Sequence, residues 1–176
     1  VAYIKLYSAN TVNTSFLLGK AKVAPSHGHT IPRLELCAAV LAAELSDIIR
    51  DQLDIDPDDF YYYTDSLVVL GYLTNETRRF YIYVGNRVSR IRSSCQPTQW
   101  SHVSTNDNPA DLATRSISTK DLPESLWIKG PNLLSINDKH DEHDHLLVDP
   151  ENDKEIRPSV SCKKTDLKIE DNKTLL

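Results

Sequence analysis

The spacing of apolar residues divides the chain into strands and helices. Alternating apolar and polar positions in residues 1–7, and an apolar run in residues 15–24, predict a hairpin of two strands across the polar turn between them. From Arg33 to about Leu53, apolar residues recur at helical spacing. The N-terminal part of the chain therefore combines a hairpin with one long helix.

Shorter elements follow the long helix. The aromatic run Tyr61–Thr64 predicts a strand, and Ser66 is placed to cap a helix that begins directly after it. The later elements are a helix at 78–94, a strand at 98–103, and a helix at 109–116 that begins after Asn108. This order of elements predicts an α/β fold with a mixed sheet.

The composition changes along the chain. A length of 176 residues is enough for one domain with a core of its own. After about residue 135, charged residues, asparagine and histidine dominate, and large apolar residues are few. We expect one domain over residues 1–135, followed by a flexible charged linker or tail over residues 136–176.

The cysteine and hydropathy patterns favour an intracellular protein, cytoplasmic or nuclear. The 3 cysteines are far apart and lack CxxC spacing, which predicts neither a disulfide framework nor a zinc site. No run of about 18 apolar residues is present, so we expect no membrane span. The chain has no methionine and opens on a strand-like pattern, which predicts a fragment of a longer polypeptide.

Glu35 is a carboxylate on a helical stripe of small residues. Its neighbours on that stripe are alanines, and a carboxylate on such a face is costly to bury unless a positive group pairs with it. Arg33, Lys20 or Lys22 could be that partner, which would make the role structural. A bound cation is the functional alternative.

Two aspartates lie at the ends of predicted elements. Asp65 ends the aromatic strand, where ligand sites form in open α/β sheets, but an aspartate there can also cap the next helix. Asp111 lies in the first turn of its helix, where the helix dipole stabilises a negative charge. Together with Glu35, they form the kind of set that holds two divalent ions such as Mg²⁺ for phosphodiester hydrolysis.

Five segments carry a resemblance to a known family. They are IPRLELCAAVLAAEL, YYYTDSLVVLGYL, RFYIYVGNRVSRIR, WSHVSTNDNPADLATRS and LWIKGP. In order and spacing these closely resemble the ribonuclease H-like region in the polyprotein of BEL/Pao retrotransposons, over roughly residues 1–135. In that family the glutamate of RLEL and the aspartates of TDS and NPADLATR are metal-binding catalytic positions, which here are Glu35, Asp65 and Asp111.

The resemblance also implies a fold, a cofactor and partners. It implies the three-layer ribonuclease H fold, two Mg²⁺ or Mn²⁺ ions in an intact site, and cleavage of the RNA strand of RNA–DNA hybrids. The flanking partners would be the reverse transcriptase and integrase regions of the same polyprotein. An aspartic peptidase, a name also attached to this family, is excluded for these residues because the D-[ST]-G turn is missing.

The chain departs from the ribonuclease H pattern in two places. Such a site has a fourth carboxylate on the first strand, which in the relatives lies upstream of the first residue here, and residues 1–34 contain no acid. We therefore expect the first strand to be missing and the chain as given to be a poor or inactive nuclease. His102 lies on a strand, not in the loop that carries a catalytic histidine in many ribonucleases H, so an auxiliary role competes with that of a strand-face residue.

A basic stretch is the candidate contact to nucleic acid. The predicted phosphate-binding residues are Arg78, Arg79, Arg87, Arg90 and Arg92, with no acid between Thr77 and Asn106. An ordinary solvated helix face is the alternative. The alternative for the whole chain is a non-catalytic domain that binds nucleic acid or connects the reverse transcriptase to the integrase. Three histidines, His140, His143 and His145, are a weaker candidate for binding a transition metal.

Overall fold

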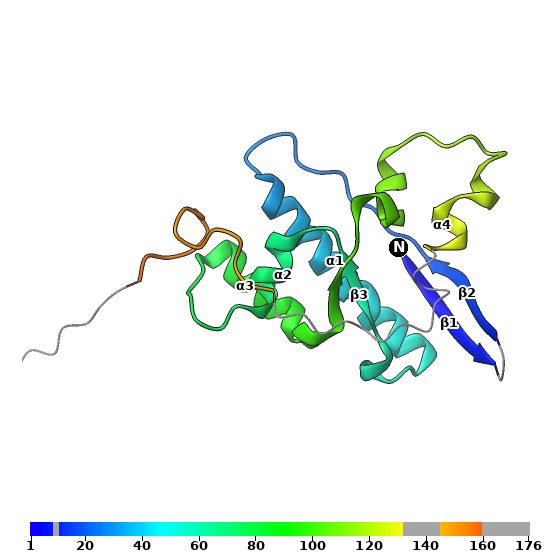
Figure 1. Cartoon of the computed structure of the whole chain (residues 1–176), viewed down its shortest axis with the longest axis horizontal. Coiled ribbons are helices and arrows are strands. Elements are labelled where there is room, and N and C mark those ends of the chain that lie inside the picture. The colour runs from blue at the N-terminus through cyan, green and yellow to red at the C-terminus, as the bar shows by residue number, and fades with distance from the viewer. Residues whose placement is uncertain (9–10, 132–144, 160–176) are drawn as a thin grey trace, which may run out of the picture.

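The computed structural model describes residues 1–8, 11–131 and 145–159, and it combines helices and strands as the sequence predicted. Its principal elements are β1 (Ala2–Ser8), β2 (Thr11–Leu18), α1 (Ile31–Leu53), β3 (Tyr62–Thr64), α2 (Leu67–Thr74), α3 (Ile82–Arg92), β4 (Trp100–His102) and α4 (Leu126–Lys129). The three longer helices gather on one side of the molecule, and the β1–β2 hairpin lies with α4 on the other (Figure 1).

The strands form two small sheets. β1 pairs with β2 in an antiparallel hairpin, and β3 pairs with β4 in parallel. The predicted single mixed sheet is therefore not formed among the described residues, because no strand joins the two pairs. The polar turn predicted before residue 15 is also wrong: β2 already begins at Thr11, where Thr and Val suit an extended strand.

Helix α1 begins and ends as its sequence requires. Pro32 stands in the first turn, where a missing N–H costs nothing, and Asp54 closes the helix in the left-handed conformation with φ of 53°. Between them, apolar residues at helical spacing build one face of the core. The core that α1 shares with α2, α3 and the β3–β4 pair contains Leu36, Ala39, Ala43, Val69, Leu70, Tyr72, Leu73, Val84, Val88 and Ile91.

The β3–β4 pair is fixed to α1 through its aromatic residues. The rings of Tyr62 and Trp100 stack with centroids 4.8 Å apart, and the Tyr62 hydroxyl donates to Ser46 Oγ of α1 at 2.7 Å. Burial raises the pKa of Tyr62 to about 12. The end of β3, which leads into Asp65, is therefore held in a fixed position beside α1.

Residues 145–159, which we name the C-terminal strap, pack against α2 and α3. Ile156 is buried and forms a β-bridge with Phe80, and the Arg157 N–H donates to Arg79 O at 2.7 Å. The sequence did not predict these contacts, since the strap lies within the range expected to be a flexible tail. The domain boundary at residue 135 stays a prediction.

None of the helices in the described part of the chain has the length and apolar character needed to cross a membrane.

Candidate functional site

Glu35 and the end of β3 meet at one hydroxyl group. Ser66 Oγ donates to Glu35 Oε2 at 2.6 Å and accepts from the Val69 N–H at 3.2 Å. The Ser66 side chain therefore caps α2 and also orients Glu35. The predicted N-cap at Ser66 is confirmed. Arg33, one candidate partner of Glu35, pairs with Glu155 instead. Glu35 thus lies half-buried beside the residue that follows Asp65.

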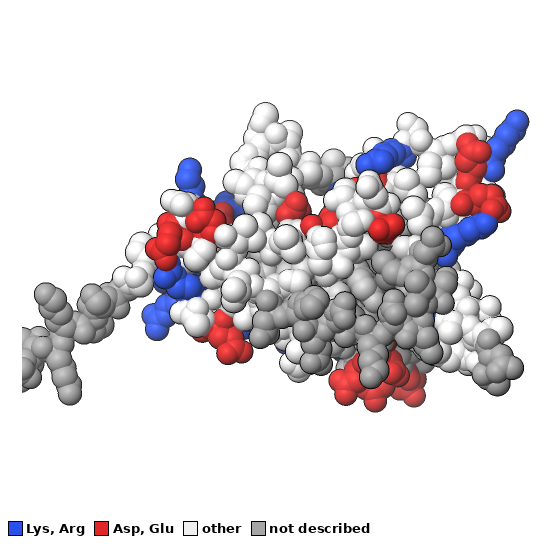
Figure 2. Space-filling view, viewed as in Figure 1, with Lys and Arg blue, Asp and Glu red and all other residues white. Residues whose placement is uncertain are grey.

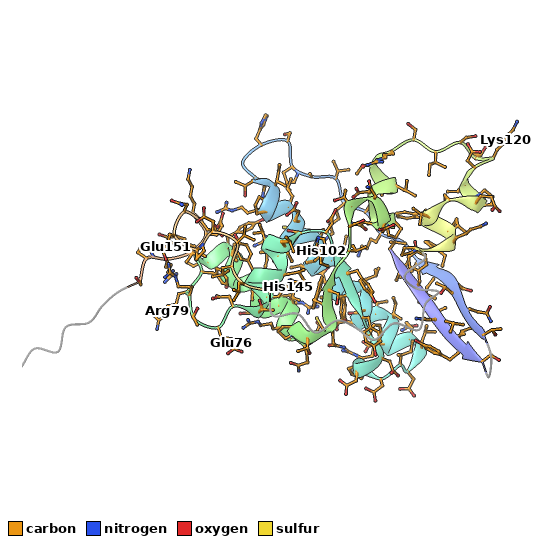
Figure 3. All side chains as sticks on the ribbon, viewed as in Figure 1. Glu76, Arg79, His102, Lys120, His145 and Glu151 are labelled. Atoms are coloured by element: carbon orange, nitrogen blue, oxygen red, sulfur yellow. The ribbon has the colours of Figure 1, made fainter. Side chains whose placement is uncertain are left out.

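Asp65 lies at the carboxyl end of the parallel pair. The cap of α2 is Ser66 and not Asp65, so the structural alternative for Asp65 is wrong. In the register of the pair, Thr64 stands opposite His102, and the Val103 N–H donates to Thr64 O at 3.0 Å. The half-buried Asp65 directly follows β3, and the exposed His102 is the last residue of β4 at the same edge, central in Figure 3.

Asp111 is held by a separate local structure. It lies in the 3₁₀ helix Pro109–Thr114, which Asn108 caps by accepting from the Ala110 N–H at 3.1 Å. Its carboxylate lies 3.9 Å from Arg115, one turn further along. The predicted cap and first-turn position are confirmed, but the element is a 3₁₀ helix whose neighbours include α4.

The three predicted ligands do not form one metal site by themselves. Carboxylate oxygens suit Mg²⁺ or Mn²⁺, and Glu35 and Asp65 lie at one edge. However, the parts of the chain described here contain no group of three or more His, Cys, Asp or Glu side chains that could hold a metal ion. The side chains present do not fit a two-ion site without a further ligand.

The guanidinium groups of four of the five predicted phosphate-binding arginines contact other groups of the same chain. Arg78 pairs with Glu151 and Arg90 with Asp47, both through Nη2. The guanidinium of Arg87 lies 3.5 Å from the centre of the Tyr83 ring, and Arg92 donates to Leu73 O and Asn75 O. Arg79 is exposed. In the view of Figure 2, lysine and arginine side chains lie toward the two ends of the molecule.

The histidine group is only partly described. His140 and His143 lie outside the described residues, so the proposed transition-metal site is not addressed by the structure. The backbone carbonyl of His145 accepts from the Thr74 hydroxyl of α2.

The sequence missed Glu155 altogether. This carboxylate is 7% exposed, and both of its oxygens accept from Arg33, at 2.6 and 3.0 Å. Its position in a polar tail gave no sign of burial. The one available signal was Ile156, an apolar residue directly after it.

Comparison with known proteins finds one family model that matches the N-terminal part of the chain. Residues 1–66 match the family described as Pao retrotransposon-like RNaseH-like domain. No curated protein and no solved structure matches the chain. The matched range includes Glu35 and Asp65 and ends before Asp111. The predicted resemblance to the ribonuclease H-like region of Pao retrotransposons is therefore confirmed over residues 1–66.

Proposed function

We propose that this chain is part of a retrotransposon Pol polyprotein and that its ribonuclease H-like domain descends from, or belongs to, an enzyme that cleaves RNA in RNA–DNA hybrids. The observation that carries the proposal is the contact between Ser66 and Glu35 inside the range that matches the family. It holds Glu35 against Ser66, the residue that directly follows Asp65 at the end of β3. Two neighbouring carboxylates at such a strand end would be useful for hydrolysing a phosphodiester.

The proposal includes a further strand between β1 and β3, completing a three-layer ribonuclease H fold. Two features support it. The antiparallel and parallel pairs are separate sheets among the described residues. Tyr7 of β1 also lies within electrostatic reach of Tyr63 in β3: burial raises the pKa of Tyr63, and Tyr61 and then Tyr7 raise it further. A strand from the parent polypeptide that carries a carboxylate would join the sheets and add a ligand beside Glu35 and Asp65.

A non-catalytic role is the second candidate, and a specific observation favours it. Asp111 pairs with Arg115, and within residues 1–8, 11–131 and 145–159 no group of side chains forms a metal site. A domain with this arrangement could bind nucleic acid, or connect the polymerase and integrase regions, without hydrolysing anything. On either reading we propose that the chain as given is inactive or a poor nuclease.

Cleavage of a labelled RNA–DNA hybrid tests the proposal. The assay compares this chain with a version extended upstream through the proposed strand, in the presence of Mg²⁺ or Mn²⁺, with Asp65→Asn in each as the control. Cleavage by the extended chain alone, lost in its Asp65→Asn variant, would support a nuclease whose site is completed upstream. No cleavage by either chain would support the non-catalytic role.

A further inference from the structure

The C-terminal strap holds Arg33 through a two-point contact. Arg33 Nε and Nη2 donate to the two oxygens of Glu155 at 2.6 and 3.0 Å. The planar guanidinium fork binds a phosphate group with the same geometry. The Arg33 side chain remains 31% exposed although Glu155 is buried. Arg33 is therefore a partly exposed anion-binding group, and the anion that it binds is the carboxylate of Glu155 in the same chain.

Two more acids of the strap reach donors on the helical part of the molecule. Arg78 Nη2 donates to Glu151 Oε1 at 2.8 Å, and the Tyr72 hydroxyl donates to Asp153 Oδ2 at 2.7 Å. Glu151, Asp153 and Glu155, at alternate positions of the strap, therefore each contact a different donor outside the strap. The donor surface of Arg33, Tyr72 and Arg78 is named here the strap-binding surface.

A further cationic side chain, that of Arg79, follows directly after Arg78 of the strap-binding surface. Arg79 is exposed and lies at the same end of the molecule as Glu151 (Figure 3). Side chains of Lys and Arg meet those of Asp and Glu at this end in the space-filling view (Figure 2). An anion with several charges that replaced the acids of the strap would meet Arg33 and Arg78, which those acids bind, and Arg79 is the next residue after Arg78.

We propose that the strap-binding surface binds the phosphate backbone of a nucleic acid, and that the acidic strap is an internal competitor that must be displaced first. The inference rests on the proposed function, which supplies the nucleic-acid ligand. Exchange of one anion for another leaves the arginines paired, so their charges are not left without a partner. Glu151, with a side chain 75% exposed, is the acid that leaves most easily.

Binding of a non-cleaved RNA–DNA hybrid, measured by fluorescence anisotropy without divalent metal, tests the competition. Glu151→Gln removes the anion from Arg78 at an exposed position and does not threaten the fold. We expect the variant to bind roughly two- to fivefold more tightly, with the slope of log affinity against log salt steeper by about one. The matched control is Glu124→Gln, which removes an acid of nearly equal exposure, 74%, from its pair with Lys129 and should change affinity less. No tightening, or equal tightening in both variants, would overturn the inference.

Amide hydrogen exchange of the strap separates this inference from the proposed function. The Arg157 N–H donates to Arg79 O at 2.7 Å, and the Tyr81 N–H donates to Glu155 O at 2.9 Å, so both bonds join the strap to the helical part. The inference predicts that both the hybrid and heparin, a polyanion without bases, accelerate exchange of these two amides. Hybrid binding with unchanged exchange would overturn the inference and leave the proposed function standing. Acceleration by heparin without any binding of the hybrid would support the competition and count against the proposed substrate.

Discussion

Two regions of this molecule are built in different ways. The helical half (α1, α2, α3, β3 and β4) contains all of the largest fully buried side chains, which are Tyr72, Leu36, Leu70, Leu73, Ile91, Val69 and Val84. The hairpin half (β1, β2 and α4) contains no buried residue in any of its three elements. The half that holds Glu35 and Asp65 therefore has a core of its own, and the other half does not.

Within the hairpin half, β1 and β2 depend on contacts with α4. The Tyr3 hydroxyl donates to the carbonyls of Leu126 and Trp127 at 3.0 and 2.9 Å, and the Phe16 ring lies 6.1 Å from that of Trp127. An isolated two-stranded hairpin is marginally stable at best in water. The elements that carry Glu35 and Asp65 are therefore packed into a core, although the two strand pairs are separate sheets among the described residues.

The largest expected effect on stability comes from shortening a buried side chain in the core. Leu36→Ala should lower the free energy of unfolding by about 3 kcal/mol, because Leu36 is fully buried and its removal leaves a cavity. The same change at Leu6 of β1, which is 54% exposed, should cost less than about 0.5 kcal/mol. Urea denaturation of the two variants checks the difference. Equal losses would show that the hairpin half shares the core.

Two glycines distinguish the two halves, because a change to alanine should lower the stability of the fold at one and raise it at the other. A Cβ at Gly19 would lie 2.6 Å from the Trp127 ring, so Gly19→Ala should disrupt the contact with α4 and destabilise by about 1–2 kcal/mol. A Cβ at Gly85 in α3 meets only Phe80, at 3.9 Å, so Gly85→Ala should stabilise by roughly 0.5–1 kcal/mol. Thermal unfolding measures both. Stabilisation by Gly19→Ala would contradict the packing described here.

A smaller effect is expected at the cap of α2. Ser66→Ala removes the acceptor for the Val69 N–H and the donor to Glu35, and should cost about 1 kcal/mol. Glu35→Gln keeps an oxygen that can accept from Ser66, so it should change stability by less. Chemical denaturation of the two variants distinguishes the cap from the contact with Glu35. A greater loss from Glu35→Gln would show that the carboxylate itself stabilises the fold.

The smallest expected effect is a pH dependence in the helical half. Burial raises the pKa of Asp47, but hydrogen bonds from Arg90 and Ser94 and the charges of Arg90 and Arg50 outweigh it and hold the pKa below its ordinary value. The resulting stability, below about 1 kcal/mol, is present above about pH 4 and is lost as the pH falls through the folded-state pKa.

Denaturation between about pH 2 and 6 checks this prediction. The stability difference between the native chain and Asp47→Asn should shrink as the pH falls. Glu124→Gln, at the exposed pair near α4, is the control and should show no comparable trend. A difference that grows toward low pH would contradict the sign of the Asp47 shift.

The sequence predicted those features that local pattern controls. The long helix, the cap at Ser66 and the cap at Asn108 follow from apolar spacing and from the side chains of the capping residues. The family resemblance selected Glu35 and Asp65, and the structure shows a contact between Glu35 and Ser66, the residue after Asp65.

Features that depend on distant contacts could not be predicted. Glu155 is buried because Arg33, far away in the chain, approaches it, and nothing in the surrounding polar residues indicates this. Arg90 and Arg92 look like a free basic face in the sequence, whereas Asp47 and the carbonyl of Leu73 accept from them in the structure. Whether two strand pairs join into one sheet likewise depends on which strands lie next to them, and not on the alternation of apolar and polar residues within each strand.

The strand proposed to join the hairpin to β3 is the part of the proposal that needs a direct test. Amide hydrogen exchange, measured residue by residue in this chain and in the chain extended upstream, tests it most directly. We expect the amides of β1 and β2 to exchange much faster than those of α1 and α2 in this chain, and those of β1 to gain protection in the extended chain. Equal protection of the two halves here, or no gain in β1 on extension, would contradict it.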